Sequence, residues 1–171
     1  LKAQNRINKE LILFLNFSCS KDDISNGIDC VGESFFVKLK HTTDAVNTKK
    51  VDFVIEIRDA RMPDASKKPM LDQLIQNKPR LILLSKKDKA DKELTKQWVN
   101  ALETENQKVL ALDFIHENFS KQLIKASNEL CINLIEKQKR RGMKPRALRA
   151  MVCGIPNVGK STFINYLLGH S

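Results

Sequence analysis

Apolar residues after position 50 form short runs that alternate with segments of helical periodicity. The short runs predict β-strands at residues 51–57, 81–84, 109–112 and 147–153. Helical spacing predicts helices at residues 69–77, 92–105 and 162–168, and a longer helix that ends near Gly142. The helix at residues 92–105 is expected to bury Leu94, Trp98 and Leu102. Because the strands are apolar on both faces, the pattern predicts an α/β fold with a parallel sheet and right-handed crossovers.

Residues 1–50 have a less regular pattern and no catalytic signature. The apolar run at residues 11–15 predicts a buried strand or helix, residues 18–32 a polar loop, and residues 35–47 a helix that leads into the first parallel strand. We therefore divide the chain into an N-terminal segment, residues 1–50, and an α/β domain, residues 51–171.

The turn between the last predicted strand and the last predicted helix carries the clearest chemical signal. Residues 154–161 (Gly-Ile-Pro-Asn-Val-Gly-Lys-Ser) fit the phosphate-loop pattern G-x-x-x-x-G-K-[ST]. Gly154 and Gly159 let backbone N–H groups point at a polyphosphate, and the helix N-terminus adds its positive end. Lys160 is expected to reach the β- and γ-phosphates and Ser161 to bind Mg²⁺. A strand–helix turn without a ligand is the alternative, which the match at all four fixed positions disfavours.

A second motif lies upstream, directly after the strand at residues 81–84. Residues 85–88 are Ser-Lys-Lys-Asp, and the carboxylate of Asp88 can accept hydrogen bonds from guanine N1–H and the 2-amino group, a donor pair that adenine lacks. The stem of Lys86 can lie along the base or ribose. Because this motif normally follows the phosphate loop, the inverted order predicts a circularly permuted GTPase. Asp88 disfavours an ATP-binding protein.

Ligands of parallel sheets bind at the carboxyl ends of the strands. Residues 59–63 (Asp-Ala-Arg-Met-Pro), residues 85–88 and the phosphate loop all follow strands, so we expect them to converge. The predicted nucleotide site consists of Ser85, Lys86, Asp88, Gly154, Pro156, Asn157, Val158, Gly159, Lys160, Ser161 and Thr162.

Composition adds a charge imbalance, because 30 Lys and Arg residues face 20 Asp and Glu residues. Seven basic residues and no acid fall within thirteen positions, namely Lys137, Lys139, Arg140, Arg141, Lys144, Arg146 and Arg149. This density is typical of a surface that binds a nucleic-acid backbone, and a solvated helix end is an equally weighted alternative. The four cysteines lack C-x-x-C spacing and the three histidines lie far apart, so metal binding by them is not expected. No apolar run approaches the roughly 20 residues that span a bilayer.

With these motifs, residues 51–169 resemble the YlqF/RbgA family of circularly permuted GTPases, which act in assembly of the large ribosomal subunit. The resemblance rests on residues 59–63, 77–80, 85–91, 142–150 and the phosphate loop. It implies Mg²⁺-dependent hydrolysis of GTP to GDP and phosphate, and contact of the Lys137–Arg149 stretch with rRNA. It also implies a location in the bacterial cytoplasm or, in a eukaryote, in the mitochondrion or plastid. We expect a monomer.

The resemblance implies two catalytic residues, both in the phosphate loop. Lys160 would stabilise charge on the phosphate oxygens. Asn157 would help to hold K⁺, which supplies positive charge in similar GTPases, or alternatively would make a local hydrogen bond that shapes the loop.

The sequence also departs from the family pattern. Ser85 stands where the family has asparagine, which predicts weaker contacts to guanine and to the phosphate loop. Residues 113–115 carry no convincing signature of the third contact loop, and the family's P-G-H-M element is absent, with no role transferred to His41. The switch loops and the D-x-P-G sensor are not among the 171 residues, so the predicted fold is incomplete at its C-terminal end. The alternative function is a non-hydrolysing scaffold that binds the ribosome and rRNA and retains a degenerate nucleotide site.

Overall fold

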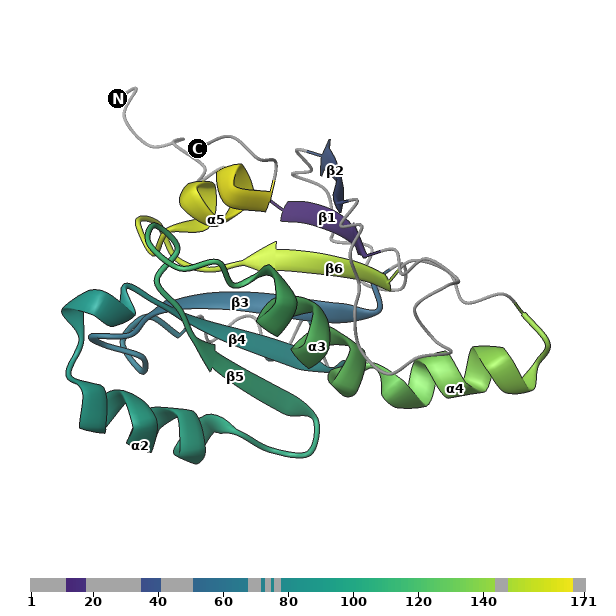
Figure 1. The fold of residues 1–171 in the computed structure, drawn as a ribbon, viewed down its shortest axis with the longest axis horizontal. Helices are drawn as coiled ribbons and strands as arrows, with labels where there is room; N and C mark the ends of the chain where they lie inside the picture. The colour runs from purple at the N-terminus through teal and green to yellow at the C-terminus, as the bar shows by residue number, and fades with distance from the viewer. Residues whose placement is uncertain are drawn as a thin grey trace, which may run out of the picture.

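The computed structural model describes residues 12–17, 35–40, 51–67, 72, 75, 78–143 and 148–167. They form one six-stranded sheet in the order β2-β1-β6-β3-β4-β5 (Figure 1). The strands are β1 (Ile12–Phe17), β2 (Phe35–Lys40), β3 (Phe53–Asp59), β4 (Arg80–Ser85), β5 (Gln107–Ala111) and β6 (Leu148–Cys153). The helical elements are η3 (Lys87–Lys89), α2 (Lys92–Leu102), α3 (Ser120–Leu130), α4 (Ile132–Arg140) and α5 (Lys160–Leu167).

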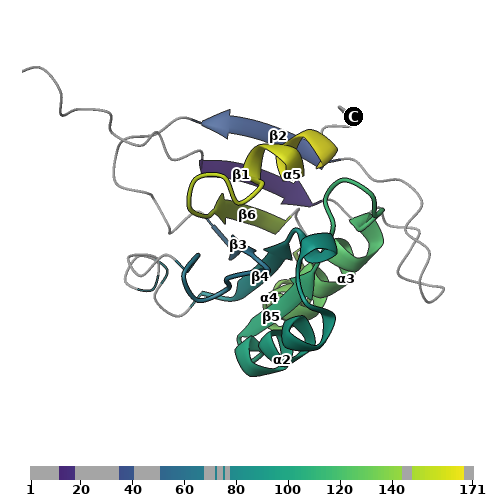
Figure 2. The same ribbon diagram turned by 90° about the vertical axis from the view of Figure 1, so that its left-hand side faces the viewer.

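The four strands after residue 51 are parallel to one another in the order β6-β3-β4-β5, as the sequence predicted. Strand β1 pairs antiparallel with both β6 and β2, and its direction opposite to β2 and β6 is seen in Figure 2. The helix predicted at residues 35–47 is wrong over residues 35–40, which form β2. This stretch alternates Val37, Lys38, Leu39 and Lys40, a period of two that favours a strand once β1 supplies a partner.

Two predicted helices differ from the structure. The long helix before Gly142 is divided at Cys131 into α3 and α4, and α4 extends beyond the sheet (Figure 1). In α2, Leu94 is 56% exposed, because the stripe that faces the sheet runs instead through Thr95, Trp98, Val99 and Leu102. Of the helix predicted at residues 69–77, Asp72 and Ile75 are helical, and the rest lies outside the described residues.

Apolar side chains cover both faces of the sheet. One face carries the largest cluster, in which β3 and β4 residues such as Ile55 and Leu83 pack against Leu123 of α3 and Phe163 of α5. The other face carries two smaller clusters, one around Val54 and Ile75 and one around Ile82, Leu84 and Trp98. Full burial of each large apolar side chain contributes about 1.5–3 kcal/mol, so this core holds the strand ends of the parallel sheet in register.

Within the described residues, no helix is long and apolar enough to cross a membrane. Burial raises the pKa of the Cys131 thiol to about 12. The thiol of Cys131 is therefore protonated and packs as an apolar side chain.

Candidate functional site

The three sequence motifs lie at one edge of the sheet, as predicted. Strand β3 ends at Asp59 and β4 ends at Ser85, and these two residues are register partners. Strand β6, which lies on the other side of β3, ends at Cys153, directly before the phosphate loop. Motifs that are about 70 residues apart in sequence can therefore contact one another.

The phosphate loop is a tight turn between β6 and α5 that requires glycine at two positions. Gly159 has a φ of +99°, in the left-handed region that a side chain strains. A Cβ atom on Gly154 would lie 2.6 Å from the carbonyl oxygen of Ile57, so the loop backbone packs directly on β3. Asn157 has a φ of +63°, a conformation that asparagine tolerates better than most residues. The loop conformation thus explains both glycines of the motif.

Gly154→Ala is expected to lower the free energy of unfolding by about 3 kcal/mol, because the backbone of Ile57 must move to admit the methyl group. Gly142→Ala is the matched control, since a Cβ atom there meets nothing within 4 Å and only the φ of +67° is unfavourable. That control is expected to cost about 1 kcal/mol. Urea denaturation of both variants measures the difference, and equal losses would contradict the close packing of the loop on β3.

Lys160 occupies the concave side of the phosphate loop. Its Nζ atom donates hydrogen bonds to the carbonyl oxygens of Gly154, at 2.8 Å, and Ile155, at 2.6 Å. The first intrahelical bond of α5, from Phe163 N to Gly159 O, is 2.9 Å long, so the helix begins at the loop as the motif requires. The loop and its ammonium group are therefore arranged to receive an anion at a helix N-terminus.

The other loop residues divide into exposed and buried side chains. Pro156, Asn157, Ser161 and Thr162 are exposed, whereas Val158 is buried. Val158 can therefore contact a ligand only through its backbone. Ser161 lies at the start of α5, where its hydroxyl group could reach a Mg²⁺ ion bound to a phosphate in the loop. Within the described residues no group of three or more His, Cys, Asp or Glu side chains could hold a metal ion.

Ser85 contacts the phosphate loop directly, although its side chain is shorter than that of the family's asparagine. Its buried Oγ atom lies 2.6 Å from the carbonyl oxygen of Val158 and 3.0 Å from that of Arg58. The single hydroxyl hydrogen can serve one of these carbonyls at a time. Since Ser85 is only 1% exposed, its role in this structure is to connect β4 with the loop.

Ser85→Ala is expected to lower the free energy of unfolding by about 1–2 kcal/mol, because buried carbonyl oxygens lose their donor. It is also expected to weaken nucleotide binding about tenfold if the loop loses its shape. Ser127→Ala is the control, since the Ser127 hydroxyl group is equally buried but bonds Leu123 O within α3. Thermal unfolding and nucleotide titration of both variants test this, and an unchanged nucleotide affinity in Ser85→Ala would contradict the connecting role.

Lys86 joins all three motifs. It has a left-handed backbone, with a φ of +58°, at the start of η3. Its Nζ atom lies 2.9 Å from the carbonyl oxygen of Asn157 in the phosphate loop and 2.9 Å from Oδ2 of Asp59. The side chain thus spans from residues 85–88 to the phosphate loop, and the contact of its stem with a base or ribose stays a prediction.

Asp59, which the sequence placed at the site without a role, holds Lys86 in this position. Its carboxylate also accepts two hydrogen bonds from the guanidinium group of Arg61, at 2.7 and 2.9 Å. Hydrogen bonds from the guanidinium group of Arg61 are the main reason that the pKa of Asp59 lies well below its usual range. Burial opposes this shift, and the ammonium group of Lys86 adds to it. Sequence patterns miss this role because the Asp59–Lys86 contact joins residues from different strands.

The ion pairs of Asp59 predict a pH dependence of stability. Because the pKa of Asp59 is lower in the folded than in the unfolded chain, its ionised form stabilises the fold above about pH 4, and this contribution is lost as the pH falls below about 4. Asp59→Asn is therefore expected to be less stable than the unmodified chain at pH 7, with a gap that narrows toward about pH 3. Urea denaturation across this range, with exposed Asp64→Asn as control, measures the gap. A gap that stays constant would contradict the account.

Asp88 is exposed within η3, as a residue that reads a ligand must be. The pKa of Arg61 is raised, mainly by its hydrogen bonds and charge attraction to Asp59. The charge of Asp88 adds a smaller effect, so Asp88 lies near Arg61. The predicted base-reading carboxylate therefore lies near the first motif and one turn from Lys86.

The loop after β5 also contacts the site, although its sequence carried no signature. A Cβ atom on Gly159 would lie 3.4 Å from the ring of Phe114, so this ring packs against the phosphate loop. Asp113 accepts hydrogen bonds from the backbone N–H groups of Ile115 and His116, and Glu117 Oε1 lies 2.6 Å from Nζ of Lys87. The only signal in the sequence was an aspartate suited to a turn, which does not indicate a site.

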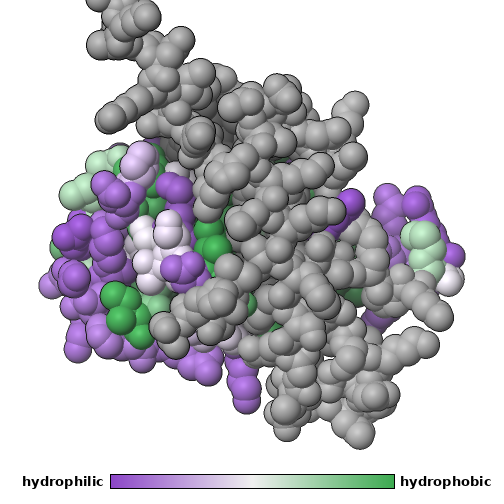
Figure 3. Space-filling view, turned by 90° about the horizontal axis from the view of Figure 1, so that it is seen from above, coloured by the Kyte–Doolittle hydropathy of each residue, from purple (hydrophilic) through white to green (hydrophobic). Residues whose placement is uncertain are grey.

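The described residues of the basic stretch lie on two different elements. Lys137, Lys139, Arg140 and Arg141 are exposed at the end of α4, which lies in a hydrophilic part of the surface in Figure 3. Arg149 instead lies on β6, where its Nε atom is 3.7 Å from a carboxylate oxygen of Asp52. Lys144 and Arg146 lie outside the described residues.

Comparison with known proteins confirms the resemblance found in the sequence, although no family model matches the chain. Ribosome biogenesis GTPase A of Bacillus licheniformis is 45% identical over 119 residues, which are 70% of this chain and 42% of the relative. Mitochondrial ribosome-associated GTPase 1 of Mus musculus is 36% identical over 120 residues, which are 70% of this chain and 36% of the relative. The chain thus spans less than half the length of these relatives.

A solved structure supports the fold class independently. The GDP-bound structure of TM YlqF matches with a TM-score of 0.51 and 32% identity, over 72% of this chain and 46% of that chain. The predicted α/β fold with a parallel sheet of the YlqF type is therefore confirmed. The resemblance to the YlqF/RbgA family is confirmed as well.

Proposed function

We propose that this chain, which resembles the YlqF/RbgA family of circularly permuted GTPases, binds GTP and GDP and hydrolyses GTP to GDP and phosphate. The observation that carries the proposal is the 2.9 Å contact from Lys86 to Asn157 O, because it joins a guanine-reading motif to a phosphate loop. The names of the similar proteins add support, since they describe GTPases and one solved structure is described as GDP-bound.

Each residue of the site has a role that follows from its position. The backbone N–H groups of residues 157–160 would bind the phosphates. Pro156, which has no N–H group, and Val158 would shape the turn, and Thr162 would add a hydroxyl group at the start of α5. Lys160 would leave its two carbonyl acceptors to bind the β- and γ-phosphates, and Ser161 would hold Mg²⁺, which neutralises charge on the transferred phosphate. Asp88 would accept two hydrogen bonds from guanine.

Asn157 is proposed to hold K⁺ as well as to shape the loop. Its side chain is exposed and its backbone is left-handed, which supports a role in which the amide oxygen would reach a monovalent cation beside the phosphates. The cation would supply positive charge during attack by water.

The proposed domain of this activity comprises residues 51–171, preceded by the N-terminal segment 1–50. In this division, β1 and β2 extend the sheet of the nucleotide-binding domain on the side of β6.

The proposed partner is the large ribosomal subunit, bound by a monomer. The similar proteins are named for ribosome biogenesis or ribosome association. The exposed basic residues at the end of α4 suit rRNA phosphates, whose neutralisation contributes salt-dependent affinity. The proposed location is the bacterial cytoplasm or the matrix of a mitochondrion or plastid.

Phosphate release from GTP, measured with and without purified large ribosomal subunits, tests the proposed function. We expect the subunits to accelerate hydrolysis of GTP but not of ATP. Replacing Lys137, Lys139, Arg140 and Arg141 with glutamine should reduce this acceleration, while replacing Lys92 and Lys96 of α2 should not. Subunit binding without any nucleotide hydrolysis would instead favour the scaffold function, and failure of both binding and hydrolysis would overturn the proposal.

A further inference from the structure

A group of buried charges lies on the face of the sheet opposite α3 and α5. On this face, Glu56 and Arg58 of β3 and Arg80 of β4 separate the apolar cluster around Val54 from the one around Ile82. Glu56 is 0% and Arg58 2% exposed. Apolar residues of similar volume would often stabilise such a position as well or better, so fold stability alone does not account for these charges.

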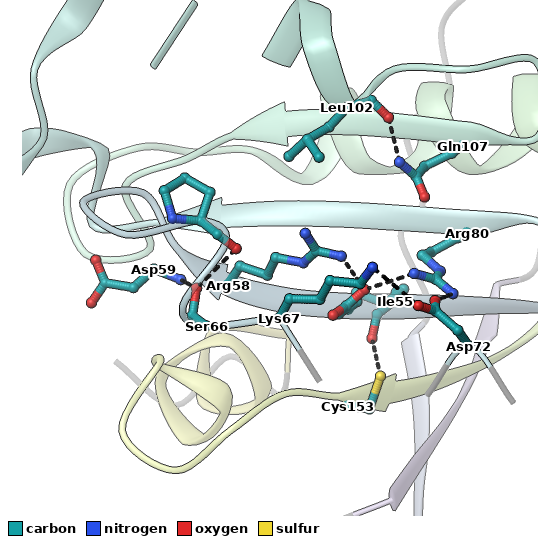
Figure 4. A network of polar contacts seen from close by, with 12 residues as sticks. Ile55, Arg58, Asp59, Ser66, Lys67, Asp72, Arg80, Leu102, Gln107 and Cys153 are labelled. Carbon is teal, nitrogen blue, oxygen red and sulfur yellow. Dashed lines mark hydrogen bonds and ion pairs between the residues drawn. The ribbon is translucent and has the colours of Figure 1, made fainter. Parts of the chain in front are cut away.

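The charges form a chain that reaches the surface (Figure 4). Oε2 of Glu56 receives Arg58 at 2.9 Å and Arg80 at 3.3 Å. Arg80 also binds Asp72, whose second oxygen lies 3.1 Å from Nζ of Lys67. The carboxylate of Asp72, whose side chain is 45% exposed, is thus held between two cations at the outer end of the chain.

Four of these residues, Arg58, Lys67, Asp72 and Arg80, line a cavity of about 350 Å³, which we call the Arg58 cavity, whereas Glu56 is buried beneath it. Its charged lining consists of four cations, Arg58, Lys67, Lys78 and Arg80, and two carboxylates, Asp64 and Asp72. Nε of Arg58 is buried and makes no hydrogen bond among the described residues. The cavity therefore has an excess of positive charge and at least one donor whose bonding is incomplete.

One end of the Arg58 cavity is distant from the phosphate loop, although Arg58 itself directly precedes Asp59 and its carbonyl oxygen lies 3.0 Å from Oγ of Ser85. Arg80 lies at the amino end of β4, whereas Ser85, which contacts the loop, lies at its carboxyl end. At about 3.3 Å per residue, the two ends of this strand are roughly 17 Å apart.

We infer that the Arg58 cavity binds a phosphate group in place of the Asp72 carboxylate. A carboxylate offers two oxygens, and these engage Lys67 and Arg80. A tetrahedral phosphate offers more acceptor oxygens and a charge of about −1.5 to −2, so it can engage Lys67 and Arg80 together and leave acceptors for a further cation of the lining. The phosphate can belong to a small anion or to an RNA backbone.

The test is titration of the ¹⁵N-labelled whole chain with inorganic phosphate at constant ionic strength, followed by NMR. The amide signals of Thr104, Asn106 and Gln107, which line the cavity, and the side-chain Nε–H signal of Arg58 report binding there. Signals of residues 154–160 report binding at the phosphate loop, and a Lys160→Ala background weakens that site. We expect saturable shifts of the cavity signals in both backgrounds.

Two variants of opposite expected sign make the test specific. Asp72→Asn removes the competing carboxylate and should strengthen phosphate binding about three- to tenfold, whereas Lys67→Gln should weaken it by a similar factor. Glu93→Gln, on exposed α2, makes the same charge change as Asp72→Asn and should leave binding unchanged. Shifts confined to the phosphate loop, or equal effects of Asp72→Asn and Glu93→Gln, would overturn the inference.

A second titration with a short RNA identifies the source of the phosphate. Shifts of the same cavity signals at lower concentration than with inorganic phosphate would assign the cavity to an RNA backbone. Shifts with inorganic phosphate alone would assign it to a small anion.

Discussion

Replacement of Asp88 with asparagine is expected to lower the affinity for GDP at least a hundredfold. In the proposed site the carboxylate would accept hydrogen bonds from guanine N1–H and the 2-amino group, whereas the amide nitrogen of asparagine would repel one of these donors and displace the base from the other contact as well. Loss of two hydrogen bonds to a charged group, at about 1.5–3 kcal/mol each, corresponds to roughly a hundredfold or more. Because Asp88 is exposed, the thermal stability of the variant should be nearly unchanged. Titration with a fluorescent GDP analogue measures the effect.

Two comparisons make the Asp88 result specific to base recognition. Glu105→Gln changes another exposed carboxylate to an amide and should leave GDP affinity unchanged. Xanthosine diphosphate, which carries an acceptor oxygen in place of the 2-amino group, should bind Asp88→Asn better than GDP does. Equal loss of affinity for all diphosphates would show that the substitution disturbs the loop and not the reading of the base.

Lys160→Ala is also expected to reduce GDP affinity by about a hundredfold or more, because the variant would lose contacts with the phosphates and not with the base. The ammonium group lies inside the loop, where its hydrogen bonds to Gly154 and Ile155 show that it reaches the concave surface. Removing a charge that contacts two phosphate groups costs roughly 3 kcal/mol or more in binding. Isothermal titration calorimetry with GDP gives the affinity directly.

The identity of the nucleotide base should not change how much affinity the Lys160→Ala variant loses. In contrast to Asp88→Asn, the Lys160→Ala variant should lose affinity for GDP and xanthosine diphosphate by similar factors. Lys96→Ala removes a 72% exposed lysine of α2 and is the control for the loss of one positive charge. An affinity in Lys160→Ala within threefold of the unmodified chain would contradict a phosphate-binding role for the loop.

The parallel part of the fold could be predicted because its strands are buried on both faces. The segments that form β3, β4, β5 and β6 are apolar at nearly every position, so each can be recognised as a buried strand from its apolar residues without an alternating pattern. Strand β2 could not be predicted in this way, because its pattern becomes decisive only when β1 provides a hydrogen-bonding partner. The division of α3 from α4 at Cys131 likewise had no glycine or proline to indicate it.

The candidate site was predictable where one motif contains its own chemistry. Gly154, Gly159 and Lys160 are constrained by the loop itself, and the structure gives each the conformation or contact that the motif requires. The contacts of Ser85 and Asp59 depend on which strands are neighbours, so the sequence could not supply them. The sequence predicted weaker contacts for Ser85 than for asparagine but could not predict which loop atom it meets, and the structure places its hydroxyl group 2.6 Å from Val158 O.

The most direct test of a guanine-nucleotide site at this edge of the sheet is parallel titration of the unmodified chain with fluorescent GDP and ADP analogues in the presence of Mg²⁺. The account predicts saturable binding of GDP that is at least a hundredfold tighter than that of ADP, because Asp88 has matching donors only on guanine. Equal affinity for the two nucleotides, or no binding of either, would contradict it.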